Sequence, residues 1–595
     1  MKWTAAPAAL ALMIATAAPA QQAADAVAPE AATVAGSVAT SDRVRAAEAD
    51  KAAGRPVEAG EWMVAAAHPL AVEAGADVLA RGGSAADAMV AVQSVLGLVE
   101  PQSSGLGGGA FLVWYDAASG RLTTLDGRET APLAASPRLF QDDAGQPLKF
   151  FDAVIGGRSV GVPGTPALMQ AAHDRWGRLD WAGLFDPAIA LARDGFTVSP
   201  RLAQLVALDA SRLASHPATS AYFMPGGVPL AEGTLLRNPD YADSLTALAT
   251  RGAAPFYTGD IAQDVVAAVR GVSDNPGVLE SIDMAIYHIR EREAVCGGYR
   301  VWDICGMGPP SSGGLSVGQI LGLLEPFDLT ALGPASAEAW RLIGDASRLT
   351  FADRGRYMAD SDYVPVPVKG LLDRGYLADR ARLLESEGAL TEVAPGRPEF
   401  DHALNWADDD AIERPSTSHI SIVDAEGNAL SMTTTIENAF GSRVMVRGFL
   451  LNNELTDFSF SSHADGVPIA NRVEPGKRPR SSMAPTIVMK DGAPVLVVGS
   501  PGGSRIIGYV AQAIIAHLDW GMDVQEAVSM GHLVNRFGRY DIEAGTHAET
   551  LQEPLAALGF ETSVTDLNSG LHAISLGDRL RGGADPRREG IALGE

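Results

Sequence analysis

Cysteine is nearly absent from this chain, which has only 2 among 595 residues. So few cysteines exclude a disulfide-rich scaffold and a zinc module built on cysteine ligands. Basic residues are also scarce, since 46 Lys and Arg face 72 Asp and Glu and leave a formal net charge of -26. A surplus of this kind repels phosphate backbones, and no local basic stripe offsets it. We therefore expect no nucleic-acid partner.

Long hydrophobic runs are missing too. The apolar stretch 5–17 is shorter than the ~20 residues of a membrane-spanning helix, and polar residues or glycine interrupt every later stretch. It follows Lys2 and precedes the small-x-small sequence Ala18-Pro-Ala20, which is typical of a secretory signal peptide. We predict a signal peptide over 1–20 with cleavage before Gln21, no membrane span, and a periplasmic or secreted bacterial protein.

Two common catalytic signatures are absent. The chain has no G-x-x-x-x-G-K-[ST] loop and no H-E-x-x-H motif among its 11 histidines. The glycine run 105–109 follows no strand of a βαβ unit, so it gives little support for a dinucleotide site. We expect neither a cofactor nor a metal ion.

The arrangement of apolar residues predicts an α/β fold. Residues 21–60 are rich in Ala, Glu and Asp with little periodicity, which predicts a flexible lead-in. Hairpins backed by helices further along predict a layered sandwich with antiparallel strands at its centre. The expected helices are 68–81, 84–99 and one from Ser504 as N-cap to 518, and the expected strands are 110–115, 121–126, 419–424, 429–436, 486–489 and 495–498.

The two cysteines flank a short alternating run. Cys296 and Cys305 lie on either side of Gly297-Gly298 and Tyr299, which looks like a hairpin. In an oxidising compartment they could bridge its two strands as a disulfide. Two buried free thiols are the alternative.

A group of hydroxyl residues opens the hairpin near residue 420. If the turn is centred on Glu426, Thr417 lies directly opposite Thr435. Such a pair is usually only a good β-sheet contact. However, Gly502-Gly503 would present backbone N–H groups just before a helix, an arrangement that stabilises a developing oxyanion. Arginines at 478 and 480 and the acidic residues of 453–458 add charges of both signs between residues 417 and 503.

Eight short motifs are spread over nearly the whole chain from Met63. They are Gly105-Leu-Gly-Gly-Gly109, Asp126-Gly-Arg-Glu-Thr-Ala-Pro132, Gly161-Val-Pro-Gly164, Pro309-Pro-Ser-Ser-Gly-Gly314, Thr417-Ser-His419, Leu451-Asn-Asn-Glu-Leu-Thr-Asp-Phe458, Lys477-Arg-Pro-Arg-Ser-Ser-Met483 and Gly499-Ser-Pro-Gly-Gly-Ser504. With these motifs in this order, the chain resembles the gamma-glutamyltransferases (gamma-glutamyltranspeptidases), which are N-terminal nucleophile hydrolases made as a single precursor.

The resemblance implies an αββα sandwich formed jointly by two chains from one precursor. Cleavage is expected between Ser416 and Thr417, giving a large subunit (61–416, after the lead-in 21–60) and a small subunit (417–595) that remain a heterodimer. Thr417 then becomes the nucleophile and its own α-amino group the base, since an α-amine has a pKa of ~8. Thr435 is expected to position the Thr417 hydroxyl, and Gly502 and Gly503 to supply the oxyanion donors.

The resemblance also implies a substrate. Gamma-glutamyl compounds such as glutathione are expected as donors, with water, amino acids or dipeptides as acceptors. Arg128, Ser481 and Ser482 are expected to bind the α-carboxylate, because a planar guanidinium suits this task. Asp457, Glu454 and Glu437 are expected to bind the α-ammonium.

Two departures from the family pattern bear on specificity. Many members have Asn where this chain has Glu437, so the ammonium site is expected to be more acidic. The segment 458–477 is shorter than the lid loop of glutathione-preferring members and lacks their aromatic residue, which predicts a more open site. A cephalosporin-type acylase on the same fold and a periplasmic binding protein without processing remain the alternatives, and the retained Asp457 and Glu454 favour an aminated substrate.

Overall fold

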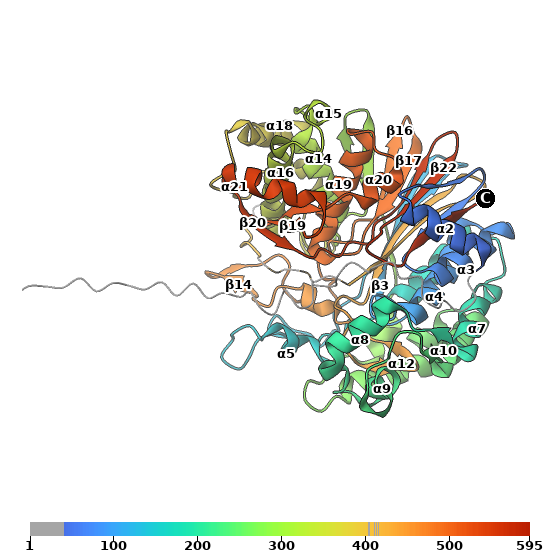
Figure 1. Cartoon of the computed structure of the whole chain (residues 1–595). Helices are drawn as coiled ribbons and strands as arrows, with labels where there is room; N and C mark the ends of the chain where they lie inside the picture. Colours follow the sequence, from blue (N-terminus) through green and yellow to red (C-terminus); the bar gives the residue numbers. More distant parts are fainter. Residues whose placement is uncertain (1–40, 401, 403–404, 410, 412, 414–415) are drawn as a thin grey trace, which may run out of the picture.

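The structure, a computed structural model, describes residues 41–400, 402, 405–409, 411, 413 and 416–595. Two seven-stranded antiparallel sheets stack face to face, and helices cover both outer faces (Figure 1). The predicted αββα sandwich is confirmed. The predicted signal peptide lies outside the described residues.

The first sheet, called here the β11 sheet, carries the hairpin that begins at Thr417. This hairpin lies at its centre, between strands that come from much earlier in the chain. In spatial order the strands are β23 (Ile591–Gly594), β2 (Met63–Ala66), β10 (Ser418–Val423), β11 (Ala429–Thr435), β3 (Gly109–Asp116), β4 (Arg121–Gly127) and β7 (Arg290–Arg292).

The second sheet, called here the β17 sheet, contains the second predicted hairpin and the two cysteines. Cys296 and Cys305 face each other on its last two strands and form a disulfide. In spatial order the strands are β1 (Val57–Ala59), β22 (Leu580–Ala584), β21 (His572–Leu576), β17 (Ala493–Gly499), β16 (Thr486–Lys490), β9 (Trp302–Gly306) and β8 (Val295–Tyr299).

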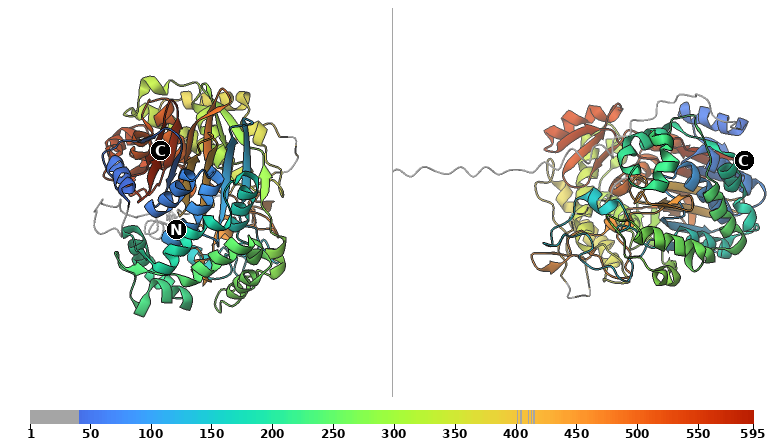
Figure 2. Two further views of the ribbon diagram at one scale, coloured as in Figure 1. Left: turned by 90° about the vertical axis from the view of Figure 1, so that its right-hand side faces the viewer. Right: turned by 90° about the horizontal axis from the view of Figure 1, so that it is seen from below.

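Three apolar layers hold this sandwich together. Between the sheets, Val113 and Val423 of one sheet pack with Ile487 and Val497 of the other. Figures 1 and 2 show the strands between two groups of helices. The β11 sheet is covered by α3 (Pro69–Ala80), α4 (Ala85–Val99) and α6 (Thr165–Trp176), and the β17 sheet by α14 (Gly313–Leu324), α16 (Ala337–Tyr357) and α19 (Ile506–Leu518).

The structure corrects the flexible lead-in predicted for 21–60 from residue 41 onward, and the rest of that segment lies outside the described residues. Residues 42–52 form helix α2 (Asp42–Ala52), which buries Val44 and Ala47, and β1 then pairs with β22. Lys51 Nζ donates to the carbonyls of Arg588 and Gly590, both at 2.7 Å. The helix has little apolar surface of its own and depends on these contacts with the other end of the chain. The composition of the segment does not reveal such contacts.

Candidate active site

Thr417 lies just before β10, opposite the last residue of β11. Ser418 pairs with Thr434 across the two strands, so the predicted register, which places Thr417 opposite Thr435, is confirmed. Thr417 Oγ1 donates to Thr435 Oγ1 at 3.4 Å, and Thr435 Oγ1 donates to the carbonyl oxygen of Ser416 at 2.8 Å. The backbone N–H of Glu437 donates to Thr435 Oγ1 at 2.8 Å. The Thr435 hydroxyl thus donates its one proton to the Ser416 carbonyl and accepts hydrogen bonds from the Thr417 hydroxyl and the Glu437 N–H.

Two buried groups that sequence reasoning missed contact Thr417 and its neighbour Ser418. Arg588 Nη1 donates to the Thr417 carbonyl at 2.9 Å, and Ser418 Oγ donates to Glu100 Oε2 at 3.1 Å. Burial raises the pKa of Glu100, although Arg201 and Arg588 act in the opposite direction. Arg588 is 171 residues from Thr417 in the chain, and no motif connects the two.

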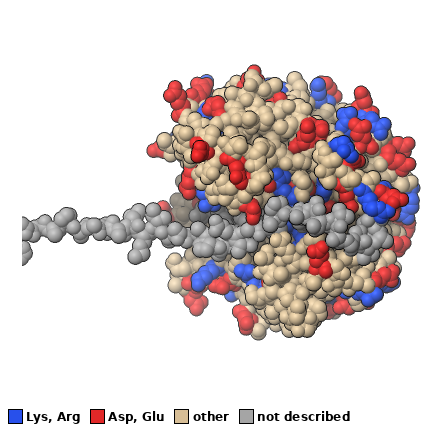
Figure 3. All heavy atoms as spheres, viewed as in Figure 1, with Lys and Arg blue, Asp and Glu red and all other residues tan. Residues whose placement is uncertain are grey.

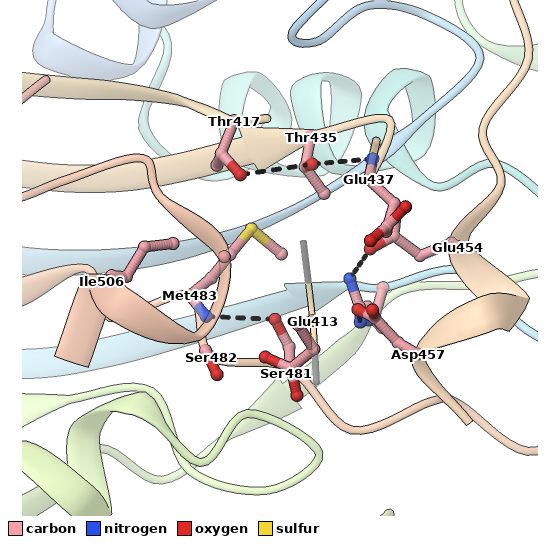
Figure 4. Close-up of a pocket in the computed structure, with 12 residues that line it drawn as sticks. Glu413, Thr417, Thr435, Glu437, Glu454, Asp457, Ser481, Ser482, Met483 and Ile506 are labelled. Carbon is pink, nitrogen blue, oxygen red and sulfur yellow. Dashed lines mark hydrogen bonds and ion pairs between the residues drawn. The ribbon is translucent and has the colours of Figure 1, made fainter. Parts of the chain in front are cut away.

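The cavity beside Thr417 is called here the Thr417 pocket (Figure 4). It contains every predicted site residue except Gly502, the neighbour of Gly503. In Figure 4, Thr417 and Thr435 lie on one side, and Ser481 and Ser482 lie on the other. The lining residues are Arg128, Glu413, Thr417, Thr435, Glu437, Glu454, Asp457, Ser481, Ser482, Met483, Gly503 and Ile506.

Arg128 is fully buried just after β4 and already has partners. Its guanidinium donates to the carboxylates of Glu454 and Asp457, and to the carbonyls of Pro479 at 3.2 Å and Arg480 at 2.8 Å. Burial alone would lower the pKa of Arg128, but Glu454 and Asp457 outweigh it and raise the pKa. Arg128, the predicted carboxylate ligand, is therefore paired here with two of the three predicted ammonium ligands.

The ionisation of the carboxylates in the pocket depends on the charges near them. Burial raises the pKa values of Glu454 and Asp457 well above their ordinary range, although Arg128 acts in the opposite direction. Glu437 has a positive φ of 74° and accepts a hydrogen bond from Asn453 Nδ2. An ammonium group entering here would favour the ionised carboxylates, since an opposite charge stabilises them.

Gly502 and Gly503 form a tight turn before α19. Their φ angles are 137° and 57°, which L side chains rarely adopt. A Cβ on Gly502 would lie 2.7 Å from the ring of Tyr509. The prediction that Ser504 caps the helix is wrong, because a 3-10 turn, Gly503–Arg505, precedes Ile506. The Ser504 hydroxyl accepts instead from Arg536 Nη1 at 2.6 Å.

The serine pair lies against groups that sequence reasoning did not connect with the site. Ser481 Oγ accepts from the Met483 N–H at 3.1 Å, and Ser482 Oγ accepts from Arg354 Nη2 at 2.8 Å. Arg354 also pairs with Glu413. Arg354 belongs to α16, which reads as an ordinary amphipathic helix, so nothing in the residues around it indicates that it reaches the pocket.

Two other kinds of site find no support in the described residues. The stretch Gly314-Leu-Ser-Val-Gly318 fits the serine-elbow pattern G-x-S-x-G, but Ser316 is buried within α14 rather than exposed on a strand-to-helix turn. Among the described residues, no three His, Cys, Asp or Glu side chains are grouped so as to hold a metal ion, and no helix is both long and apolar enough to span a bilayer.

The charged side chains at and behind the pocket are buried, unlike those on the face shown in Figure 3. On the face shown in Figure 3, acidic and basic side chains are interspersed over the visible area. Arg128, which lines the pocket, and Arg354 and Arg480, which contact its lining residue Glu413, are 0%, 2% and 0% exposed. Buried charges of this kind must be paired, so the pairing of carboxylates with guanidiniums determines the charge that a ligand meets in the pocket.

Comparison with known proteins gives one answer at the level of family. The glutathione hydrolase proenzyme of Bacillus subtilis (strain 168) is 38% identical over 549 residues, which cover 90% of this chain and 91% of the relative. The glutathione hydrolase proenzyme of Escherichia coli (strain K12) is 36% identical over 550 residues, covering 89% of this chain and 91% of the relative. The crystal structure of cephalosporin acylase from Bacillus halodurans superimposes with a TM-score of 0.80 at 25% identity, covering 91% of this chain and 97% of that one.

The family model described as gamma-glutamyltranspeptidase matches residues 71–595. This range contains the whole Thr417 pocket and every strand of the two sheets except β1 and β2. On this match and these relatives, the chain belongs to the gamma-glutamyltranspeptidase family.

Proposed function

We propose that this protein is an exported, self-processing gamma-glutamyl hydrolase and transferase. The observation that carries the proposal is the contact between Thr417, Thr435 and the Ser416 carbonyl. The Thr417 hydroxyl attacks the Ser416 carbonyl carbon, whose oxygen is already hydrogen-bonded to Thr435. As the peptide bond breaks, the Thr417 Oγ1 proton passes to its nitrogen, Ser416 forms an ester with Thr417 Oγ1, and the α-amino group of Thr417 is released. Water then hydrolyses the ester and leaves Thr417 as a new N-terminus.

The same hydroxyl then acts on the substrate. The free α-amine accepts the Thr417 Oγ1 proton, because its pKa of ~8 is close to neutral. Thr417 attacks the gamma-glutamyl amide, and the N–H groups of Gly502 and Gly503 stabilise the oxyanion. The leaving amine takes a proton, and the acyl group passes from Thr417 to water or to the amine of an amino acid or dipeptide.

The charges of the pocket support a zwitterionic substrate. Its α-carboxylate binds Arg128, Ser481 and Ser482, and its α-ammonium binds Asp457, Glu454 and Glu437. Arg128 is paired with Glu454 and Asp457, so the zwitterion inserts between existing ion pairs. Each charge of the substrate thereby meets a partner that is already oriented.

A glutaryl acylase is the second candidate, favoured by the similarity to the cephalosporin acylase structure. A glutaryl group lacks the ammonium and would leave the three carboxylates Glu437, Glu454 and Asp457 without a cation from the substrate. Glu454 and Asp457 already pair with Arg128, and a glutaryl carboxylate would compete with them for that cation without supplying another. We therefore place the aminated substrate first.

Export rests on the signal-peptide pattern of residues 1–20. The mature protein is then a heterodimer of the large and small subunits, located in the periplasm or secreted. Its acceptors, amino acids or dipeptides, enter through the open site expected from the short 458–477 segment.

Two assays test the proposal. Purified protein is expected to give two bands with Thr417 as the N-terminus of the smaller one, whereas Thr417→Ala gives one band without amidase activity and Thr417→Ser still splits. Gamma-glutamyl and glutaryl anilides, compared with and without a dipeptide, then separate hydrolase, transferase and acylase. Splitting of Thr417→Ala at the same bond would refute the mechanism.

A further inference from the structure

Glu413 places a carboxylate in the Thr417 pocket of the uncleaved chain. Arg354 Nη2 donates both to Glu413 Oε1 and to Ser482 Oγ. Figure 4 shows Glu413 beside Ser481 and Ser482, the two residues expected to hold the substrate carboxylate. A carboxylate of the chain itself therefore lies where a substrate carboxylate is expected.

Arg354 is built into this position. It is 2% exposed, and its Nε donates to Ser312 Oγ at 2.8 Å. Burial and the nearby charge of Arg480 lower the pKa of Arg354 to about 10, although Glu413 acts in the opposite direction. Burial alone would raise the pKa of Glu413, but Arg354 and Arg480 outweigh it and lower the pKa. The two arginines thus keep Glu413 ionised.

Arg480 depends on the same segment even more. Its side chain is fully buried, with Nη2 3.0 Å from Asp409 Oδ2 and 3.4 Å from the Ala411 carbonyl, and Nε 3.5 Å from Glu413 Oε1. Its Nε and Nη1 make no hydrogen bond within the described part of the chain. Every described partner of this guanidinium therefore lies on residues 409–413, just before the proposed cleavage site.

Cleavage changes what these arginines require. Once Ser416 is a chain end, Glu413 is three residues from a free C-terminus and competes with any carboxylate in solution. If it leaves, Arg354 loses the carboxylate with which it pairs and Arg480 keeps only Asp409, so two adjacent buried guanidiniums are left with one carboxylate, which is costly in free energy. Arg128 is not a free cation beside these two arginines, because it is already paired with Glu454 and Asp457.

We infer that Arg354 and Arg480, together with Ser482, form a carboxylate-binding subsite of the Thr417 pocket, which Glu413 occupies before cleavage and the carboxylate of the acyl donor occupies afterwards. The inference rests on the proposed function. It adds two specificity-determining cations to Arg128 and limits good donors to acyl groups that carry a carboxylate.

Binding to the uncleaved protein tests the subsite without any turnover. In a Thr417→Ala background, Glu413→Ala is compared with unchanged Glu413 by calorimetry with glutarate as the probe. Removing the Glu413 carboxylate is expected to tighten glutarate binding at least tenfold, and adding Arg480→Leu is expected to abolish that gain. Equal affinity with and without Glu413 overturns the inference.

Kinetics test the same residues in the processed enzyme. Arg480→Leu is expected to raise KM at least tenfold for gamma-glutamyl and glutaryl anilides, which carry the carboxylate, and less than twofold for 4-aminobutyryl anilide, which lacks it. Arg356→Leu is the matched control, since Arg356 lies on the same helix as Arg354 but pairs with Asp408 at 2.7 Å rather than with Glu413 or Ser482. Equal KM increases for all three anilides overturn the inference.

The two tests separate the two proposals. If the unmodified protein cleaves none of the anilides, the proposed function fails, while the glutarate titration still decides whether the subsite exists. If Arg480→Leu is not processed, the glutarate titration in the Thr417→Ala background decides by itself whether the subsite exists.

Discussion

Thr435→Val removes a single hydroxyl that contacts both sides of the bond before Thr417. Valine keeps the shape and the β-branching of threonine, so β11 keeps its pairing with β10. The variant loses the bond to the Ser416 carbonyl at 2.8 Å and the bond from Thr417 Oγ1 at 3.4 Å. It also leaves the buried N–H of Glu437 without its acceptor.

The size of the effect follows from these contacts. Loss of one donor to a developing oxyanion costs ~2.7–4 kcal/mol, so precursor splitting should slow by roughly 10² to 10³. The unsatisfied N–H of Glu437 should lower the free energy of unfolding by ~1–3 kcal/mol. Thr435→Ser keeps the hydroxyl and should split at nearly the normal rate.

Thr434→Val is the matched control. Thr434 is the preceding residue of β11, fully buried, and its Oγ1 makes no hydrogen bond within the described residues. The assay is a time course of splitting, followed on denaturing gels from freshly made precursor. The reasoning is refuted if Thr435→Val splits within threefold of the unchanged protein, or if Thr434→Val is slowed as much.

Three further predictions concern binding and stability. Arg128→Lys keeps the charge but not the planar fork, so steady-state kinetics should show KM for a gamma-glutamyl anilide raised at least tenfold with processing little changed. Replacing Cys296 and Cys305 by serine opens a loop with a sequence separation of 9. Thermal unfolding should then show a loss of ~2–3 kcal/mol at most, with unchanged anilide turnover. Burial lowers the pKa values of His68 and His572 to about 4 and about 3. Between pH 6.5 and those values the unfolded chain binds more protons than the folded one, so their contribution to stability falls as pH falls. Denaturant titrations at several pH values should show a shallower acid-side loss in His572→Asn.

The sequence was most informative where one segment determines its own geometry. Alternation along 418–435 and a symmetric turn predicted the register that places Thr417 opposite Thr435, because a slip of one residue would turn every apolar side chain away from the core. The family motifs likewise located nearly all of the pocket.

The residues that escaped prediction act through contacts between distant segments. Arg354 and Glu413 are 59 residues apart, and Arg588 and Thr417 are 171 apart. Each reads as an ordinary helix or loop residue in its own segment. Helix α2 escaped for a related reason, since its order comes from packing against the C-terminal strand rather than from its own composition.

The interleaving of strands gives the proposed cleavage a lasting consequence. A cut before Thr417 would place β10, β11 and β23 on one chain, and β2, β3 and β4 on the other, within a single sheet. The β17 sheet would be divided in the same way, with β8 and β9 beside β16. Separating the two polypeptides would require both ladders to be torn apart, and each polypeptide alone would carry unpaired strand edges prone to aggregation. Such a molecule folds once, as a single chain. Its stability is then set by the rate of irreversible unfolding and not by a folding equilibrium, so the apparent Tm depends on the heating rate.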